Sequence, residues 1–425
     1  MKKVLIITYY WPPSGGAGVQ RWLKFAKYLP QYGWQPVVLT VDPRYASYPQ
    51  LDESLTAETG EQCLVFKTKS FELYNVYKLI SGKKEVPFGG FANASKEGMF
   101  QKLSKFLRGN FLLPDPRKGW NKYAYKKAVE LIKQFNIDTV VTTSPPHSTQ
   151  LTGLKLKKTM GIKWIADLRD PWTDIYYYSQ FNHTPMARRM DLRYERQVVE
   201  NADVIVTVSE DVKRIFASKS SLPVKDKIHV IPNGFDQDDF MERAVTKETK
   251  KVITYTGTIS EAYDIDHFLE ALKGMDEQLK STILLRFVGN MPPSVIQKFR
   301  ESGLEIELTG YVDHTKSIDY LLRSDLLLLI IPRVKNNQGI LTGKFFEYLA
   351  SRKPILAIGP TDGDLARIME ETGCGTLFDY ENAKGMHRFM VDCLRSAEPW
   401  MTREEKAEAY SRKQLTGRMV GLLNA

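Results

Sequence analysis

Residues 335–351 read KNNQGILTGKFFEYLAS and lie between two apolar runs, LLLLII at 326–331 and PILAI at 354–358. Short apolar runs of this kind are typical of buried parallel strands, and a Thr-Gly-Lys start followed by an amphipathic pattern is typical of a helix. The sequence therefore predicts a strand over 326–331 and a helix that begins near Gly343. In α/β sheets, ligands bind where the carboxyl end of a strand meets such a helix.

The start of this helix is suited to a phosphate group. The first N–H groups of a helix, here those of Leu341 and Thr342 onward, have no partner inside it, and the helix dipole adds to their attraction for an anion. Gly343 permits close approach, and Lys344 adds a full positive charge. Glu347 lies one turn further on the same side, within reach of a ribose hydroxyl pair. The pattern indicates a nucleotide site. An ordinary loop glycine at 343 with two solvent-exposed charged residues, Lys344 and Glu347, is equally compatible with this stretch.

The composition indicates a globular protein of two domains with an anionic partner. The chain has 425 residues, of which 43% are hydrophobic and 26% are charged, and its net charge is +10. That length exceeds one ordinary domain. A basic balance favours a sugar nucleotide, an anionic membrane or a nucleic acid, but no nucleic-acid-binding module is recognisable. The cysteines show no metal-type spacing, which favours a reducing compartment: Cys63, Cys374 and Cys393.

No export signal or membrane span is expected. The first apolar run, residues 4–7, is too short for the core of a signal peptide, and the longest one, 326–331, is far shorter than the ~20 residues of a spanning helix. We therefore expect a cytoplasmic protein, peripheral at most on the inner face of the plasma membrane. Residues 99–113 predict a basic amphipathic helix, which fits contact with an anionic membrane or packing on the first domain's core.

Both halves of the chain alternate strand and helix patterns, and this predicts two doubly wound α/β domains. A turn cluster, Pro232-Asn233-Gly234, separates the halves, so the boundary is expected after residue 232. The strands expected in the first half are Val4–Thr8, Pro36–Val41, Ile137–Thr142, Lys163–Asp167, Asp203–Val208 and Lys227–Ile231. Those expected in the second half are Val252–Tyr255, Thr282–Val288, Leu304–Leu308, Leu326–Ile331 and Gly375–Phe378.

The loop after the first strand is rich in glycine. Gly15, Gly16 and Gly18 lie between the expected strand and the first helix, as glycines do in a dinucleotide fingerprint. Arg21 stands where that fingerprint needs a third small residue, so a dinucleotide site is not indicated.

Two further loops of the first half carry reactive side chains. His147 follows Ser-Pro-Pro at the end of one expected strand, and the sequence has only six histidines, which favours a functional role. Asp167, Arg169 and Asp170 follow the next strand. These three residues fit either the lining of a ligand site or an internal salt-bridge network.

These stretches together resemble the retaining glycosyltransferases of the GT-B fold, in particular glycosyltransferase family 4. The resemblance covers nearly the whole chain and rests on the glycine-rich first loop, the Pro232-Asn233-Gly234 hinge and the stretch at 335–351. It implies two Rossmann-like domains that face each other across a cleft. The N-terminal domain, 1–232, would hold the acceptor and be joined by a C-terminal helix over 402–423, and the domain over 233–401 would bind the nucleotide sugar.

The resemblance also assigns roles to individual residues. It implies catalytic roles for His147, Lys344 and Asp170, and acceptor-side roles for Asp167 and Arg169. The residues that it implies for donor binding are Gly15, Gly16, Gly257, Thr258, Gln338, Leu341, Thr342, Gly343 and Glu347. No metal and no cofactor are implied besides the nucleotide-diphospho-sugar, which is a substrate.

The sequence departs from the family pattern at two positions. The family has a glutamate near the donor sugar where this chain has Gly339, so Asn336, Asn337 or Gln338 would substitute. The basic pair that the family has beyond Gly257 is also absent.

The function that follows is transfer of a sugar, with retention, from a UDP- or GDP-sugar to a glycan or lipid-linked acceptor, in the synthesis of a cell-surface polysaccharide or glycolipid. The alternatives are a non-catalytic nucleotide- or partner-binding subunit and a sugar-nucleotide epimerase.

Overall fold

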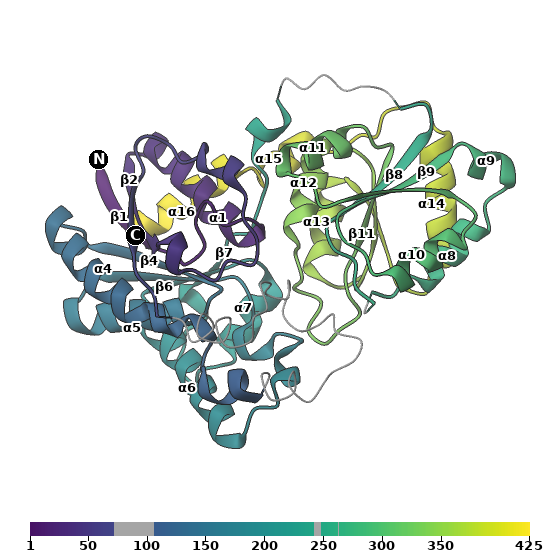
Figure 1. Cartoon of the computed structure of the whole chain (residues 1–425). Coiled ribbons are helices and arrows are strands. Elements are labelled where there is room, and N and C mark those ends of the chain that lie inside the picture. Colours follow the sequence, from purple (N-terminus) through teal and green to yellow (C-terminus); the bar gives the residue numbers. More distant parts are fainter. Residues whose placement is uncertain (72–105, 242–247, 262) are drawn as a thin grey trace. The chain divides into compact units, whose positions relative to one another are not determined.

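A computed structural model of the chain describes all residues except 72–105, 242–247 and 262 (Figure 1). The chain forms two compact units. The first comprises Met1–Pro232 with Thr416–Ala425, and the second comprises Asn233–Leu415.

The first unit is built on a parallel sheet of seven strands in the order β3-β2-β1-β4-β5-β6-β7. Successive residues of a strand point to opposite faces, and both faces of β1 are buried: Leu5 and Ile7 lie in one core cluster, while Val4 and Ile6 are buried on the other face. The strands are β1 (Lys2–Ile7), β2 (Trp34–Val41), β3 (Leu64–Thr68), β4 (Thr139–Ser144), β5 (Lys163–Leu168), β6 (Val204–Thr207) and β7 (Ile228–Val230).

Helices connect these strands, as parallel pairing requires. Side-chain caps fix some helix starts; Ser209, for example, accepts a hydrogen bond from the N–H of Val212 at the start of α7. Among the described residues, the α-helices of this unit whose two ends are both described are α1 (Ala17–Tyr28), α4 (Asn121–Phe135), α5 (Ser148–Met160), α6 (Pro185–Asn201), α7 (Glu210–Ala217) and α16 (Arg412–Asn424), which begins in the second unit.

The second unit repeats this plan with a six-stranded parallel sheet in the order β10-β9-β8-β11-β12-β13. The apolar run at its centre serves two cores, because Leu328 and Ile330 face one cluster while Leu327 and Leu329 face the other. Its strands are β8 (Lys251–Thr256), β9 (Ile283–Val288), β10 (Glu305–Gly310), β11 (Leu326–Ile330), β12 (Ile355–Ile358) and β13 (Gly375–Phe378). Its helices are α8 (Asp266–Lys273), α9 (Glu277–Ser281), α10 (Pro293–Arg300), α11 (His314–Leu322), α12 (Gly343–Ser351), α13 (Asp364–Thr372), α14 (Ala383–Arg395) and α15 (Glu404–Glu408).

Two doubly wound α/β units are thus confirmed, and the structure differs from the expectation in local detail. The segment expected as one helix over 402–423 is two helices, and residues 402–415 belong to the second unit. The physical reason is packing, because Ala407 and Tyr410 are buried in a core cluster of that unit. In the segment expected as a basic helix over 99–113, residues 106–111 are helical, and residues 99–105 lie outside the described residues.

Candidate functional site

The candidate residues of each unit gather where its strand order changes direction. In the first sheet the chain winds outward on both sides of the β1/β4 pair, and in the second on both sides of the β8/β11 pair. Loops that leave neighbouring strands at such a point diverge to opposite faces, and the space between them is the usual ligand position in open α/β sheets. The glycine-rich loop follows β1 and His147 follows β4. Gly257 follows β8, and the stretch at 335–351 follows β11.

In the second unit, the loop after β11 is pinned to its surroundings. The side-chain amide of Asn337 donates to the carbonyl of Pro332 (3.1 Å) and to the hydroxyl of Tyr380 (3.0 Å). The carbonyl of Gln338 accepts a hydrogen bond from the N–H of Asp364 (2.9 Å). The loop therefore reaches α12 along a fixed path.

Helix α12 begins at Gly343, as the sequence predicts, and its start is open. Thr342 occupies the N-cap position, yet its side chain makes no capping hydrogen bond. Its hydroxyl oxygen is inaccessible to solvent and has no partner among the described residues. The carbonyl of Thr342 accepts the N–H of Phe345 (3.2 Å). N–H groups at the first turn of a helix without a side-chain cap remain available to an anion.

Lys344 lies beside the end of β8. Its Nζ donates to the hydroxyl of Tyr255 (2.7 Å) and lies 4.1 Å from the centre of that ring. Burial lowers the pKa of Lys344 to about 7, and the neighbouring Glu347 partly opposes this shift. No carboxylate in the described part of the chain forms a salt bridge with this ammonium group. A partly buried cation without a paired anion is poised to bind one.

Gly257 is required at its position by both its backbone and its neighbour. Its φ of 97° lies in the left-handed region that side chains disfavour, and a Cβ there would lie 2.8 Å from Nζ of Lys344. The carbonyl of Thr258 accepts the Tyr255 hydroxyl (3.1 Å). The structure therefore brings Lys344, predicted as a catalytic residue, next to Gly257 and Thr258, which are predicted to bind the donor and lie almost 90 positions earlier in the sequence.

Glu347 has a partner that sequence reasoning missed. Nδ1 of His314, at the start of α11, lies 3.8 Å from a carboxylate oxygen of Glu347, and Nε2 of the same ring lies 3.1 Å from Asp239. Burial raises the pKa of Glu347, and His314 opposes the rise. No sequence signal links His314 to Glu347, because they lie on different helices and share no motif.

In the first unit, Asp167 forms a buried ion pair with Arg21. Nε and Nη2 of Arg21 donate to the carboxylate at 3.0–3.2 Å, and both side chains are fully buried. The indole N–H of Trp22 and the hydroxyl of Thr143 donate to it as well, each at 2.8 Å. The remaining guanidinium nitrogen, Nη1, donates to the carbonyl of Pro232 (2.9 Å). Arg21, which sequence reasoning noted only as a departure from a fingerprint, therefore ties α1 to the end of β5.

Arg169 and Asp170 lie just beyond this pair. Nε of Arg169 donates to the carbonyl of Ser144 (2.7 Å), which joins the loops after β4 and β5. Burial lowers the pKa of Arg169, and the carboxylates of Asp167 and Asp170 oppose that shift. Burial raises the pKa of Asp170, and no hydrogen bond to its carboxylate occurs within the described residues. A partly exposed carboxylate without a partner is available to a ligand.

His147 is held by an aromatic stack. Its ring lies 4.6 Å from that of Trp172, with an angle of 14° between the planes. Nδ1 is inaccessible and has no hydrogen-bond partner in the part of the chain that the structure describes. Burial, with Arg169 as the second cause, lowers the pKa of His147 to about 3. The imidazole is therefore neutral at physiological pH.

The glycine-rich loop leads into α1. Gly16 is the N-cap of this helix and has a φ of 86°, so a side chain there would be strained. The N–H of Gly15 donates to the carbonyl of Gln50 (2.9 Å), and a Cβ on Gly15 would lie 3.2 Å from Asp52. The loop thus exposes a second uncapped helix start at the carboxyl edge of the first sheet.

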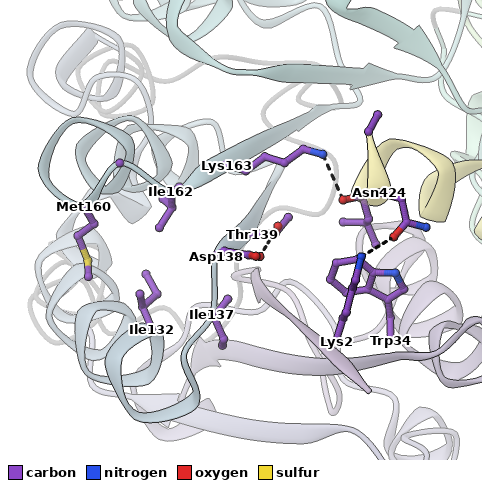
Figure 2. A pocket seen from close by; sticks show the side chains of 13 residues that line it. Lys2, Trp34, Ile132, Ile137, Asp138, Thr139, Met160, Ile162, Lys163 and Asn424 are labelled. Atoms are coloured by element: carbon purple, nitrogen blue, oxygen red, sulfur yellow. Dashed lines mark hydrogen bonds between the residues drawn. The ribbon is translucent and has the colours of Figure 1, made fainter.

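A cavity of about 510 Å³ lies at the opposite edge of this sheet, at the amino ends of the strands (Figure 2). Lys163 donates across it to the carbonyls of Leu422 and Leu423, and Lys2 donates to the side chain of Asn424. These bonds fasten the end of α16. Because the candidate residues are at the carboxyl edge, this cavity is not part of the candidate site.

The described residues contain no group of three potential metal ligands. None of their helices is long and apolar enough to cross a membrane.

Two family models match adjoining parts of the chain. Residues 94–239 match the model described as Glycosyltransferase Family 4, and residues 236–413 match the model described as Glycosyl transferases group 1. Together with the two Rossmann-like units, these matches support a GT-B glycosyltransferase of group 1. A search of curated proteins found no match.

Solved structures share the fold over the full chain. A glycosyltransferase from Rickettsia africae is 16% identical, with a TM-score of 0.60 over 99% of this chain and 97% of its own. HepE from Anabaena, solved with UDP and glucose, is 13% identical, with a TM-score of 0.61 over 100% of both chains. A variant of TarM from S. aureus, solved with UDP, fondaparinux and α-GlcNAc-glycerol, is 11% identical, with a TM-score of 0.59 over 100% of both chains.

Proposed function

We propose that the chain transfers a sugar from a nucleotide-diphospho-sugar to an acceptor hydroxyl, with the donor bound to the second unit. The observation that carries this proposal is the environment of Lys344. A partly buried ammonium group without a carboxylate partner lies beside Gly257 and at the open start of α12, where β8 and β11 end. A diphosphate would supply the anion that both the cation and the free N–H groups accept.

The donor is a UDP-sugar in this proposal, with a GDP-sugar as the alternative. The ligands of the structurally similar proteins support the first, since HepE was solved with UDP and glucose and the TarM variant with UDP. Glu347 would hold the ribose hydroxyls, with His314 keeping its carboxylate charged. Gln338, Leu341 and the N–H groups that follow would line the donor site.

Charge at the leaving group drives the chemistry. The bond from the anomeric carbon to the diphosphate breaks, a bond to the acceptor oxygen forms, and the leaving diphosphate gains negative charge. Lys344 and the start of α12 would stabilise that charge without a divalent ion. Once a diphosphate is bound, its charge favours the protonated form of Lys344, so the low pKa of the free side chain does not prevent this role.

The acceptor side lies in the first unit. The neutral ring of His147 can donate one hydrogen bond to a sugar hydroxyl but cannot act as an acid near pH 7. Asp170, with a raised pKa and an available carboxylate, would accept the proton from the acceptor hydroxyl. Arg169 would orient the acceptor, and Asp167 would hold the loop through its ion pair with Arg21.

Retention of the anomeric configuration is part of the proposal and follows from the family resemblance. The NMR coupling of the anomeric proton in the product would test it. The acceptor is proposed to be a glycan or a lipid-linked sugar of a cell-surface polymer, which the TarM ligand α-GlcNAc-glycerol supports for the glycan class.

A lipid-linked acceptor would be reached at an anionic membrane surface. Phe106, Leu107 and Phe111 of the helical residues 106–111 are exposed, by 40%, 45% and 66%. Exposed apolar side chains next to basic residues suit the interface of an anionic bilayer. Phe106→Glu with Leu107→Glu should lower binding to vesicles rich in phosphatidylglycerol and leave the melting temperature unchanged. A lower melting temperature with unchanged vesicle binding would instead assign these residues to packing.

A thermal-shift panel of UDP-, GDP- and ADP-sugars tests the proposal. A donor at about 100 times its dissociation constant should stabilise the protein by about 2.7 kcal/mol. Lys344→Met should reduce the shift, and the exposed Lys298→Met on α10 is the matched control that should keep it. The proposal fails if no sugar nucleotide shifts the wild-type protein.

A further inference from the structure

Two buried carboxylates of α6 hold the loop that follows β5. Asp191, which is 1% exposed, accepts the indole N–H of Trp172 (2.9 Å) on one oxygen and the hydroxyl of Tyr178 (2.9 Å) on the other. One turn further, Glu195 accepts the hydroxyl and the N–H of Thr173. The loop is therefore fastened to α6 at both ends of residues 172–178.

The fastened indole is the ring that supports His147. Trp172 is 2% exposed and has a single polar atom, so the bond from its N–H to Asp191 fixes how the ring is turned. The ring stacks on the imidazole of His147, with 4.6 Å between the ring centres. Its backbone N–H donates to the carbonyl of Asp170 (2.8 Å). A displacement of Trp172 would therefore disturb both candidate residues of the acceptor side, His147 through the indole ring and Asp170 through the backbone.

The two carboxylates differ in whether a cationic side chain lies beside them. Glu195 has a cationic partner, since Lys219 lies 3.2 Å from it. Asp191 receives only the two neutral donors, and within the described residues it has no ion pair. Burial raises the pKa of Asp191 to about 7. The other charged or titratable groups around it are Glu195 on the same helix, Asp115 before α4, Lys219 after α7, and His183 and Arg188 near Tyr178.

We propose that Asp191 is a positioning residue for the acceptor side: through Trp172 it sets the placement of His147 and Asp170. This inference rests on the proposed function only for the role of those two residues. It adds a residue that carries no motif and does not contact the reacting atoms. The charged carboxylate holds the indole more tightly than a neutral side chain, since hydrogen bonds to charged groups are stronger. Protonation of Asp191 near neutral pH therefore loosens the support of His147.

Asp191→Asn tests the proposal, because it keeps the shape and removes the charge. The first readout needs no ligand. In wild-type protein, the indole N–H resonance of Trp172, assigned with Trp172→Phe, should shift with pH through a midpoint near 7. In Asp191→Asn that midpoint should be absent. Asp211→Asn, which alters an acid of α7 that pairs with Arg214, is the matched control and should keep it. A midpoint that survives in Asp191→Asn overturns the proposal.

The second readout is turnover, measured as hydrolysis of UDP-glucose or of the sugar nucleotide selected by the thermal-shift panel. At saturating donor, kcat of the wild type should rise with pH through about 7, and kcat of Asp191→Asn should be about tenfold lower and flat, with KM for the donor unchanged. At pH 8 the variant should melt no lower than the wild type, because it no longer buries a charge. A lower melting temperature with an unchanged pH profile would reduce Asp191 to a structural residue.

The two readouts distinguish a failure of the positioning role of Asp191 from a failure of the proposed function. If no sugar nucleotide is hydrolysed by the wild type but the indole midpoint depends on Asp191, the proposed function fails and the contact stands. If hydrolysis occurs and neither readout depends on Asp191, the positioning role fails and the proposed function stands.

Discussion

Each unit places charged side chains at the carboxyl edge of its parallel sheet, yet the two units treat them in opposite ways. At the end of β5, Asp167 is fully engaged by Arg21, Trp22 and Thr143. Beside the end of β8, Lys344 is held by one neutral phenol, and the helix start next to it has no side-chain cap. A buried charge with all its partners inside the protein holds the fold together. A partly buried charge with a neutral partner keeps its capacity for a ligand.

The largest effect should come from breaking the engaged pair. Asp167→Ala leaves the guanidinium of Arg21 buried and uncompensated, and loss of one partner of a buried pair costs about 3–5 kcal/mol. The free energy of unfolding in urea should fall by that amount. The control is Arg44→Ala, which breaks the exposed pair with Asp42 and should leave the unfolding midpoint unchanged. An unchanged midpoint for Asp167→Ala would show that the pair is not structural.

The pH dependence should run in opposite directions for activity and stability. Burial lowers the pKa of Lys344 to about 7, so above that pH the free enzyme loses the cation, and kcat/KM for the donor should fall about tenfold per pH unit. The unfolded protein binds this proton up to about pH 10.4, and the folded protein releases it near 7. The contribution of Lys344 to stability therefore rises between these values.

This contrast is checked by measuring kcat/KM and the melting temperature from pH 6 to 9 in wild type and Lys344→Met. Both trends should be weaker in the variant. A donor kcat/KM that stays level to pH 9 would mean that the free ammonium group is not needed for donor capture.

A smaller effect is expected at the ribose contact. Glu347→Ala removes an interaction that is alike in the ground and transition states, so KM for the donor should rise about tenfold while kcat changes little. Glu277→Ala, on the exposed face of α9, is the control and should change neither constant. A fall in kcat larger than the rise in KM would assign Glu347 to the chemical step instead.

The smallest effect should be that of chelation. Lys344 and the start of α12 supply the positive charge in this account, so EDTA should leave turnover within experimental error. Loss of activity that Mn²⁺ or Mg²⁺ restores would contradict it.

Local patterns predicted the parts of the site that depend on neighbouring residues. Short local stretches are enough to recognise three features: the apolar run of β11, the start of α12 at Gly343 and the glycines after β1. The partners that decide the chemistry come from distant parts of the sequence. Arg21 meets Asp167 across 146 positions, and Lys344 meets Tyr255 across 89. Such contacts depend on the order of strands in the sheet, which a local pattern does not specify.

The same reason explains the residues that sequence reasoning missed. His314 and Asp191 are single polar residues on helices with ordinary patterns, and their importance comes from the side chains that the fold brings to them. The boundary between the units at residue 415 likewise depends on the packing of Tyr410 and not on a turn signal.

In the proposed complex Lys344 faces the departing diphosphate, so kcat at saturating donor reports directly on this contact. Removal of one preorganised donor at a developing charge typically costs about 10²–10³ in rate. Lys344→Ala should therefore lower kcat by that factor, with a melting temperature at pH 6 no lower than that of the wild type, since a buried and unpaired cation is removed. A kcat equal to that of the wild type would contradict the assignment of the phosphate site to this helix start.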